Sequence, residues 1–219
     1  ALPIYMPLQS SSDRILQAMR RSYRTDRYRG IIEKVRSAMP HATITTDIIV
    51  GFPGESEVDF QSTLDITAEM RFLATYSFQY SKRPGTPAAT MPDQIPEQVI
   101  KERYSRLHEH LNSVSLSVNE EIIGQEREVL VTDIEGSRAT GKSEDFRLVH
   151  FDSSKCDARP GDLVRVRIDA AKPHFIFSNT DPISVRKTRG GDAFEARKRE
   201  AESTGVMLGM PTLKSVLIS

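Results

Sequence analysis

The chain shows two different patterns of apolar and polar positions. The first pattern covers roughly the first hundred residues. Short apolar runs there are separated by longer amphipathic stretches, as in a parallel sheet whose strands are joined by crossover helices. The pattern predicts strands at residues 2–8, 42–50 and 75–80. It predicts helices over residues 13–19, 25–39 and 57–70. The order strand, helix, helix, strand, helix, strand indicates an open α/β sheet with right-handed crossovers.

Polar residues and proline mark the ends of these helices. Ser10, Ser12 or Asp13 is placed to cap the first helix, and Ser56 to cap the third, because short polar side chains accept hydrogen bonds from free amides of the first turn. Pro40 ends the second helix.

The second pattern of apolar and polar positions begins after a loop-rich stretch at residues 81–96 and a predicted helix from Pro96 to about Val118. Residues 126–134, 146–151, 162–171 and 174–178 then read as short strands of alternating polarity. Such strands in close succession predict a small antiparallel barrel or sandwich, so a second domain is expected from about Asn119. After Ile183 we expect a poorly anchored tail with one short charged helix.

Composition narrows the class of protein. The 219 residues include 30 Lys+Arg against 30 Asp+Glu and 38% hydrophobic residues, which is ordinary for a soluble globular protein. No apolar run reaches the roughly 18 residues of a membrane span, and the start lacks a secretory pattern. Zero net charge excludes a uniformly basic nucleic-acid-binding protein, although a local basic patch remains open. We expect a cytoplasmic protein without a membrane partner.

The first candidate for ligand chemistry is the loop after the second strand, GFPGE at residues 51–55. A strand that ends in glycine-rich backbone offers free N–H groups at the carboxyl edge of a parallel sheet, where ligands of α/β folds bind. Gly51 and Gly54 would let a ligand approach closely. A plain strand-to-helix turn is the alternative. Glu55 could bind a ligand or stabilise the helix N-terminus, and the second role is favoured.

Two further loops follow strands. In PLQSSSD, residues 7–13, helix capping is the simpler role for Ser12 or Asp13. Gln9 is less easily explained as a cap, so we expect it to contact a ligand. Arg20, Arg21 and Arg24 could meet an anionic ligand, although a solvated surface cluster is favoured.

The third strand leads into YSKRPGTPA, where the rigid turn of residues 84–87 could hold Arg83 in place. A domain linker is the alternative. The five histidines are scattered, and the chain contains no Walker loop, G-x-S-x-G elbow or H-E-x-x-H helix.

The order of PLQSSSDRILQAMRRSY, TDIIVGFPGE, YSKRPGTPA and GKSEDFRLVHF resembles the carboxyl half of the MiaB-type tRNA methylthiotransferases, which are radical S-adenosylmethionine (SAM) enzymes. The likeness includes GDAFEARKRE and GVMLGMP in the tail, which look actinobacterial. It implies the end of a partial TIM-type barrel over residues 1–95 and a connecting helix over 96–118. It further implies a small all-β TRAM barrel that binds tRNA over 119–187 and an extended tail over 188–219.

The resemblance implies attachment of a methylthio group to C2 of N6-isopentenyladenosine beside the anticodon. In the family, SAM bound to one 4Fe-4S cluster yields a radical that abstracts hydrogen, and a second 4Fe-4S cluster takes part in sulfur delivery. Related ribosomal-protein methylthiotransferases tend to carry an acidic residue where this chain has Arg83, so Arg83 favours tRNA as the substrate. The implied partners are tRNA and a missing amino-terminal half.

The resemblance also assigns candidate site residues. SAM contacts are expected from Gln9, Ser10, Asp47, Gly51, Phe52, Pro53 and Gly54. Arg83, Gly85 and Thr86 are expected to position the substrate or the cluster region. Candidate RNA contacts are Arg138, Lys142, Arg147, Arg165 and Arg167.

Three departures from the family pattern stand out. The cluster-binding C-x-x-x-C-x-x-C motif is missing, and the single cysteine, Cys156, matches no cluster ligand. Ser11 stands where the family usually has a glycine that lets the backbone approach SAM. Residues 119–187 carry 13 acidic and 11 basic side chains, so phosphate contact there requires a local patch.

We therefore expect the isolated chain to be inactive, because it has no source of electrons for cleaving SAM. A stand-alone RNA-binding module and a nonfunctional fragment are the alternatives. Salt-dependent binding of unmodified tRNA would favour the first, and aggregation through unpaired strand edges the second.

Overall fold

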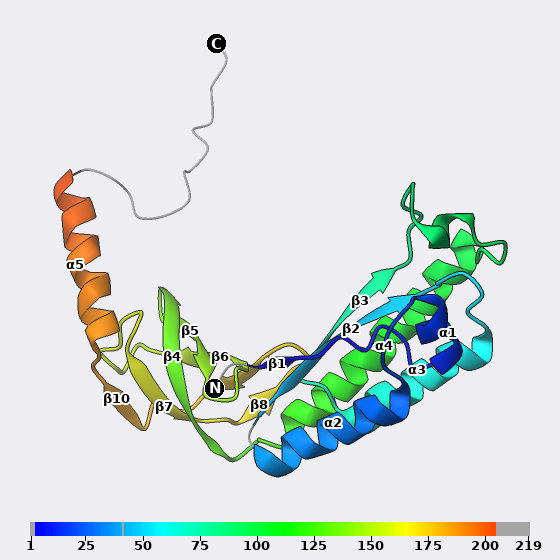
Figure 1. The fold of residues 1–219 in the computed structure, drawn as a ribbon. Helices are drawn as coiled ribbons and strands as arrows, with labels where there is room; N and C mark the ends of the chain where they lie inside the picture. The colour runs from blue at the N-terminus through cyan, green and yellow to red at the C-terminus, as the bar shows by residue number, and fades with distance from the viewer. Residues whose placement is uncertain (1–2, 41, 205–219) are drawn as a thin grey trace.

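The computed structural model describes residues 3–40 and 42–204 (Figure 1). In its first half, strands β1 (Ile4–Tyr5), β2 (Ile44–Val50) and β3 (Ala74–Gln79) form a parallel sheet in the order β1-β2-β3. Helices α1 (Asp13–Ala18), α2 (Thr25–Ala38), α3 (Glu57–Met70) and α4 (Glu97–Glu120) accompany it, with a 3-10 turn, η1 (Pro87–Thr90). The predicted order of elements is confirmed. We call residues 3–40 and 42–120 the α/β region.

Caps fix the helix starts as predicted. The Ser12 hydroxyl accepts the Ile15 N–H at the start of α1. Ser56 and Asp59 exchange hydrogen bonds at the start of α3, forming a capping box. The first strand is shorter than expected, because Pro7 has no N–H and Leu8 N–H donates to the Thr46 hydroxyl instead of continuing a regular ladder.

The two faces of the parallel sheet differ. Ile44, Ile48 and Val50 of β2 are buried with residues of α2, α3 and α4, and this cluster is the core of the region. The opposite face carries Tyr5 and Tyr76, which are 54% and 55% exposed. Figure 1 shows the large helices on one side of the strands. Parallel sheets usually have both faces covered by other elements. In this sheet the described residues cover only one face and leave the other open.

The second half contains seven strands in one mixed sheet, in the order β10-β7-β4-β5-β6-β9-β8. We call residues 121–188 the β region. Its pairs are antiparallel except for β6 with β9. The strands are β4 (Glu126–Glu135), β5 (Arg138–Ser143), β6 (Leu148–Asp152), β7 (Leu163–Arg167), β8 (Ala170–Ala171), β9 (Ile176–Ser178) and β10 (Ser184–Arg186).

Two of these strands, β5 and β10, lie outside the predicted ones. The sequence of β5 is RATGKS, which has no run of apolar residues to signal a strand. Gly141 in its middle faces β4 closely, since a Cβ there would lie 2.4 Å from the Leu130 carbonyl oxygen. β10 has three residues and pairs with β7 at the edge of the sheet.

The tail predicted over 188–219 begins with α5 (Arg189–Thr204), a helix of 16 residues that is longer than the short charged helix expected there. It projects from the β region in Figure 1. Its start is anchored: Thr188 N–H donates to Asp162 Oδ1 (2.9 Å), and Arg159 pairs with both Asp162 and Asp192. The motif GVMLGMPTL lies outside the described residues. No helix of the described chain is long and apolar enough to cross a membrane.

Candidate cofactor site

A cavity of about 640 Å³ lies at the carboxyl ends of the three parallel strands. Five residues predicted for ligand binding line it together: Gln9, Asp47, Phe52, Arg83 and Thr86. They come from the loops after β1, β2 and β3 and from β2 itself. This is the edge at which ligands of parallel sheets bind, so sequence positions more than seventy residues apart meet at one hollow.

Gln9 is held by its backbone at the edge of β2. Its N–H donates to the Asp47 carbonyl (2.7 Å) and its carbonyl accepts the Ile49 N–H (2.9 Å). Its φ of 70° is unusual for a residue with a side chain. The side-chain amide has no hydrogen-bond partner among the described residues, although Gln9 is only 5% exposed and lines the cavity. The amide is therefore available to a ligand.

Ser10, beside it, has a local role. It is 1% exposed, and its hydroxyl accepts the Ser12 N–H (3.2 Å). Ser11, which replaces the family's glycine, donates its hydroxyl to Ser62 Oγ (2.7 Å) on α3. This loop therefore packs against α3 through its serines.

Asp47 points its carboxylate to the open face of the sheet. The Tyr5 hydroxyl donates to Asp47 Oδ2, and this hydrogen bond raises the pKa of Tyr5. Phe78, 50% exposed, lies on the same face, and its ring lines the cavity with Ile49. The lining of the cavity thus includes a carboxylate and apolar side chains.

The GFPGE loop differs from its prediction in one respect. Its glycine amides are not free: Gly51 N–H donates to Glu55 Oε2 (2.9 Å), and Gly54 N–H to the Asp93 carbonyl (2.7 Å). A Cβ on Gly51 would lie 2.5 Å from Ile100 Cγ1 of α4. The absence of a side chain at Gly51 therefore lets α4 pack closely against the loop. Phe52, from the same loop, lines the cavity, and Pro53 is buried.

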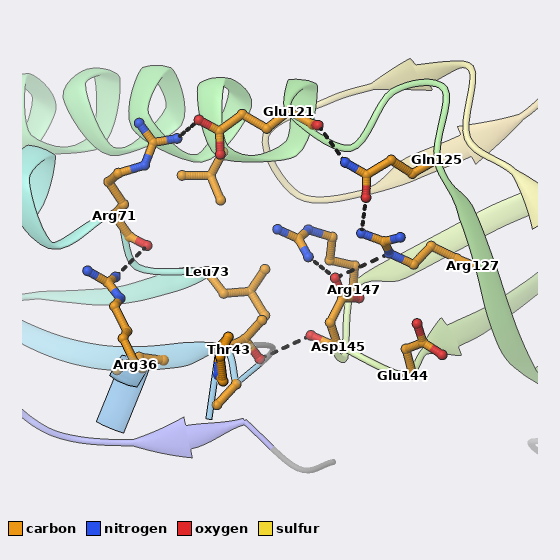
Figure 2. A pocket seen from close by; sticks show the side chains of 14 residues that line it. Arg36, Thr43, Arg71, Leu73, Glu121, Gln125, Arg127, Glu144, Asp145 and Arg147 are labelled. Carbon is orange, nitrogen blue, oxygen red and sulfur yellow. Dashed lines mark hydrogen bonds and ion pairs between the residues drawn. The ribbon is translucent and has the colours of Figure 1, made fainter. Parts of the chain in front are cut away.

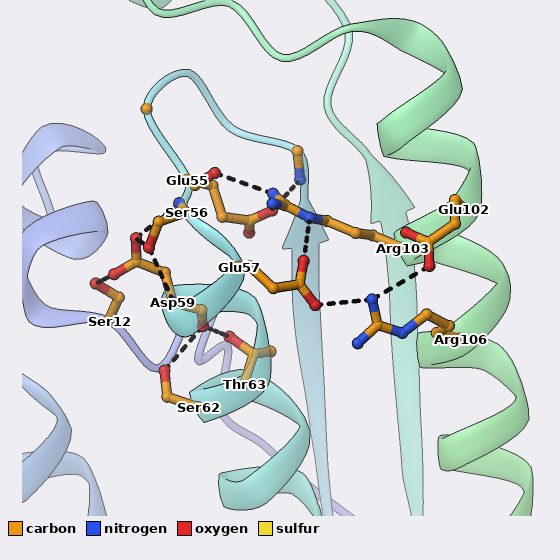
Figure 3. A network of polar contacts seen from close by, with 12 residues as sticks. Ser12, Glu55, Ser56, Glu57, Asp59, Ser62, Thr63, Glu102, Arg103 and Arg106 are labelled. Atoms are coloured by element: carbon orange, nitrogen blue, oxygen red, sulfur yellow. Dashed lines mark hydrogen bonds and ion pairs between the residues drawn. The ribbon is translucent and has the colours of Figure 1, made fainter.

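A buried ion pair locks this loop to α4 (Figure 3). Arg103 Nη1 donates to both the carbonyl and the carboxylate of Glu55, each at 2.9 Å, and the two side chains are 7% and 2% exposed. Burial raises the pKa of Glu55, while the Gly51 N–H and Arg103 oppose the rise. Glu55 thus holds its own loop, which corrects the expectation that it serves the helix N-terminus.

Sequence reasoning missed Arg103. It lies between Ile100 and Leu107 on the buried face of α4, where an arginine is costly unless paired. A charged residue at this spacing within an apolar stripe is the signal that could have revealed it.

Of the other carboxylates in Figure 3, Glu57 pairs with Arg103 and Arg106, Glu102 pairs with Arg106, and Asp59 belongs to the helix caps. Asp59 accepts from Ser12, Ser56 and Arg14. Burial acts to raise the pKa of Asp59, but these hydrogen bonds lower it to about 2. The network joins the start of α1 to the start of α3 and so fixes the loops on either side of the cavity.

The turn after β3 presents Arg83 as predicted from its prolines. Thr86 donates its N–H (3.2 Å) and its hydroxyl (2.8 Å) to the Arg83 carbonyl, and Gly85 has a φ of 82°. Arg20 and Arg21 also line the cavity. The Tyr80 ring packs on Phe52 at 5.4 Å, and its buried hydroxyl has no hydrogen-bond partner in the described part of the chain. The hollow is therefore rich in cations and holds one unused hydroxyl.

The described residues do not fit an iron-sulfur cluster. They include no group of three or more His, Cys, Asp or Glu side chains that could hold a metal ion. Burial raises the pKa of the Cys156 thiol, which opposes formation of the thiolate that a cluster needs.

The five cations predicted to contact RNA divide into two groups. Arg147 is 10% exposed and donates to Asn119 Oδ1 (2.9 Å) and to Asp145, so the structure gives it a packing role. The other four are exposed or half-buried on outward positions of β5 and β7. Arg165 and Arg167 lie 3.9 and 4.0 Å from Glu126, and Lys142 lies over the Phe146 ring.

A second cavity, of about 730 Å³, lies where the two regions meet (Figure 2). Arginines line it, but each has partners: Arg71 pairs with Glu121, and Arg36 donates to the Met70 carbonyl. Thr43 donates its hydroxyl to the Asp145 carbonyl (3.0 Å) across the junction. The charged side chains that line this second cavity thus help to join the two regions.

Comparison with known proteins identifies the relatives of the chain. The profile of the Radical SAM superfamily matches residues 3–66. The tRNA-2-methylthio-N(6)-dimethylallyladenosine synthase of Mycolicibacterium smegmatis is 52% identical over 216 residues, 96% of this chain. The synthases of the same name from Salinispora arenicola and Streptomyces coelicolor are 51% and 50% identical, over 96% and 97% of this chain.

The chain is a homologue of the MiaB-type tRNA methylthiotransferases. It spans 42–44% of the length of these curated relatives. The radical SAM match covers β1, β2, α1, α2 and most of α3. It includes the cavity-lining residues from Gln9 to Phe52 but not those from Phe78 to Ala88.

Proposed function

We propose that this chain supplies the SAM cradle and the tRNA-binding region of a tRNA methylthiotransferase that modifies C2 of N6-isopentenyladenosine. The observation that carries the proposal is identity of about half over almost the whole chain to synthases with that printed name. The open cavity at the strand ends supports it, because the lining residues from Gln9 to Phe52 lie within the part matched by the radical SAM profile.

SAM is the cofactor proposed for this cavity. A hollow of about 640 Å³ edged by the Gln9 amide, the Asp47 carboxylate and Arg83 suits a polar nucleoside with an amino-acid tail. When bound, SAM would supply the one-electron chemistry that removes hydrogen from the substrate. The roles left to this chain are to hold the cofactor through Gln9, Asp47 and Phe52, and to place the substrate through Arg83 and Thr86.

In this proposal, residues 1–95 are the end of a partial TIM-type barrel whose interior is the open face of the sheet. Residues 96–118 are the connecting helix, and residues 119–187 are a TRAM barrel. The exposed Tyr5 and Tyr76 favour the first assignment, because they occupy the face that further barrel strands would enclose. With one cysteine, the chain does not fit either 4Fe-4S cluster. An amino-terminal half is proposed as the source of the ligands.

A graft tests the activity. The matching 216-residue segment of the Mycolicibacterium relative would be replaced by this chain, and the hybrid produced in a strain without its own methylthiotransferase. We expect 2-methylthio nucleosides in digested tRNA, measured by mass spectrometry. A folded, iron-loaded hybrid that leaves tRNA unmodified would overturn the proposal, with the unaltered relative as the positive control.

The same hybrid tests individual residues. Gln9→Ala should raise the KM for SAM about tenfold (about 1.4 kcal/mol), because it removes a side-chain contact. The control Gln17→Ala, on the exposed side of α1, should leave it unchanged. Arg83→Glu should reduce kcat/KM for tRNA at least about tenfold, whereas Lys82→Ala beside it, outside the cavity lining, should not.

A further inference from the structure

Strand β9 and the residue before it place two phenylalanines on the outward face of the β region. Ile176 and Ser178 point inward and are 0% and 3% exposed. Phe175 and Phe177 alternate with them and are only half-buried. Outward positions of a strand are usually polar when that face meets solvent, so two neighbouring aromatic rings there call for an explanation.

The rings line a groove with a third ring from the neighbouring strand. Phe177 lies opposite His150 of β6 in the parallel pair. The His150 ring meets Phe175 edge-on at 5.0 Å, and Phe175 and Phe177 are 6.2 Å apart. His150 Nδ1 is 2.9 Å from the Thr140 hydroxyl, which fixes the imidazole ring. The groove encloses about 590 Å³ and continues to the Arg138 end of β5.

Two cations edge this groove. The exposed side chains of Arg138 and Lys172 form no ion pair with any described residue. One carboxylate lines the groove, that of Asp152, which lies opposite Arg138 in the β5–β6 register and accepts the Ser154 N–H (2.8 Å). The groove therefore combines flat apolar rings with a net positive edge.

We propose that this groove binds one unpaired nucleotide of the RNA substrate, with its base stacked on Phe177 and Phe175 and its phosphate at Arg138 and Lys172. Unstacked bases bind to exposed aromatic rings, and neighbouring cations neutralise the backbone. A base inside a duplex has no free π-face, so the site selects single-stranded RNA. RNA as the partner rests on the proposed function, whereas the place and manner of binding rest on this groove.

The test is RNA binding by the chain itself. A fluorescein-labelled single-stranded oligoribonucleotide and an unmodified tRNA transcript would be titrated with wild-type protein and Phe177→Leu, following anisotropy at fixed salt. Leucine keeps the apolar volume but removes the π-face, so we expect affinity for both RNAs to fall about tenfold. Phe177→Tyr should restore it.

Controls separate stacking from damage to the fold. Ile183→Ala removes an exposed apolar side chain elsewhere in the same region and should leave affinity unchanged. Double-stranded RNA should bind Phe177→Leu and wild type equally. The proposal is overturned if Phe177→Leu binds single-stranded RNA as tightly as wild type, or if wild-type protein binds neither RNA.

The two proposals fail in different ways. If the grafted enzyme methylthiolates tRNA and Phe177→Leu changes neither its KM for tRNA nor the affinity, the groove proposal fails and the function stands. If the hybrid is inactive while the chain still binds RNA through Phe177, the function fails and the groove proposal stands.

Discussion

The α/β region and the β region use the faces of their sheets in opposite ways. The parallel sheet buries Ile44, Ile48 and Val50 under helices and leaves Tyr5 and Tyr76 open. The mixed sheet packs its inward side chains against one another, among them Val164, Val166 and Ile176 at 0% exposed. The ligand site proposed for the first region therefore lies at strand ends, whereas the one proposed for the second lies on outward side chains.

Each region also fixes a loop with a buried carboxylate, but over different distances along the chain. Glu55 is paired with Arg103, 48 residues away and on another element. Asp162 is paired with Arg159, three residues away in the same loop. A long-range pair couples the loop to the packing of α4, whereas a local pair depends mainly on its own turn.

The largest expected effect is in the α/β region. Arg103→Ala leaves the Glu55 carboxylate buried without its partner, and we expect the free energy of unfolding to fall by about 3–5 kcal/mol. Tyrosine fluorescence during urea unfolding measures it, because all six tyrosines lie before residue 119 and the chain has no tryptophan. Arg106→Ala, whose side chain is 38% exposed, should cost about 1 kcal/mol. Equal losses would show that the buried pair is not special.

The next effect is in the β region. Asp162→Asn removes a fully buried charge that accepts from Arg159 and from Thr188 N–H, so we expect a loss of about 2–3 kcal/mol. Hydrogen exchange should quicken in β7 and at the start of α5. Asp157→Asn, 95% exposed, should change little. A matching loss in the tyrosine transition would mean that the two regions do not unfold separately.

Acid sensitivity sharpens the same comparison. Burial acts to raise the pKa of Asp162, but the hydrogen bonds from Arg159 and Thr188 lower it to about 2, and Asp59 is likewise lowered to about 2. A lowered folded-state pKa stabilises the fold above the ordinary value of 3.8, and that stability is lost as pH falls toward 2. As the pH falls toward 2, the free energy of unfolding measured by tyrosine fluorescence should therefore fall by about 1–2 kcal/mol less in Asp59→Asn than in the wild type. Asp162→Asn should leave that transition's pH profile unaltered.

The smallest effect on stability is expected for the outward arginines. Arg165 and Arg167 lie at 3.9 and 4.0 Å from Glu126 on the surface, so replacing either with alanine should change unfolding by less than about 0.5 kcal/mol. Each substitution should instead lower the salt dependence of tRNA binding by about one unit of slope. An unchanged slope would remove these two from the RNA contacts.

Local patterns predicted most of the elements. The ends of α2 and α3 and the cap at Ser56 were predicted to within one residue, because amphipathic period and capping depend on neighbours in sequence. β5 was missed because RATGKS has no apolar alternation and is held by its neighbours, β4 and β6. The anchoring of α5 was missed because it needs Asp162, 27 residues before the helix begins.

The residues that meet at the cavity were predicted in part. The rule that parallel strands end at one edge correctly brought Gln9, Asp47 and Arg83 to a common cavity. The same rule could not tell that the Gly51 amide is taken by Glu55, whose carboxylate also pairs with Arg103 of α4. The outward pairing of Phe175 with His150 was equally hidden, because it depends on the register of β6 and β9.

The amino-acid sequence by itself determined the order of the elements, most helix ends, and the kinship with tRNA methylthiotransferases, since these rest on local spacing and residue identity. Tertiary structure alone decided which polar groups stay available. It placed Arg103 against Glu55 and packed Arg147 against Asn119, while the Gln9 side-chain amide has no partner among the described residues. The reason is physical: burial and pairing are set by neighbours distant in sequence, and no local pattern contains those distances.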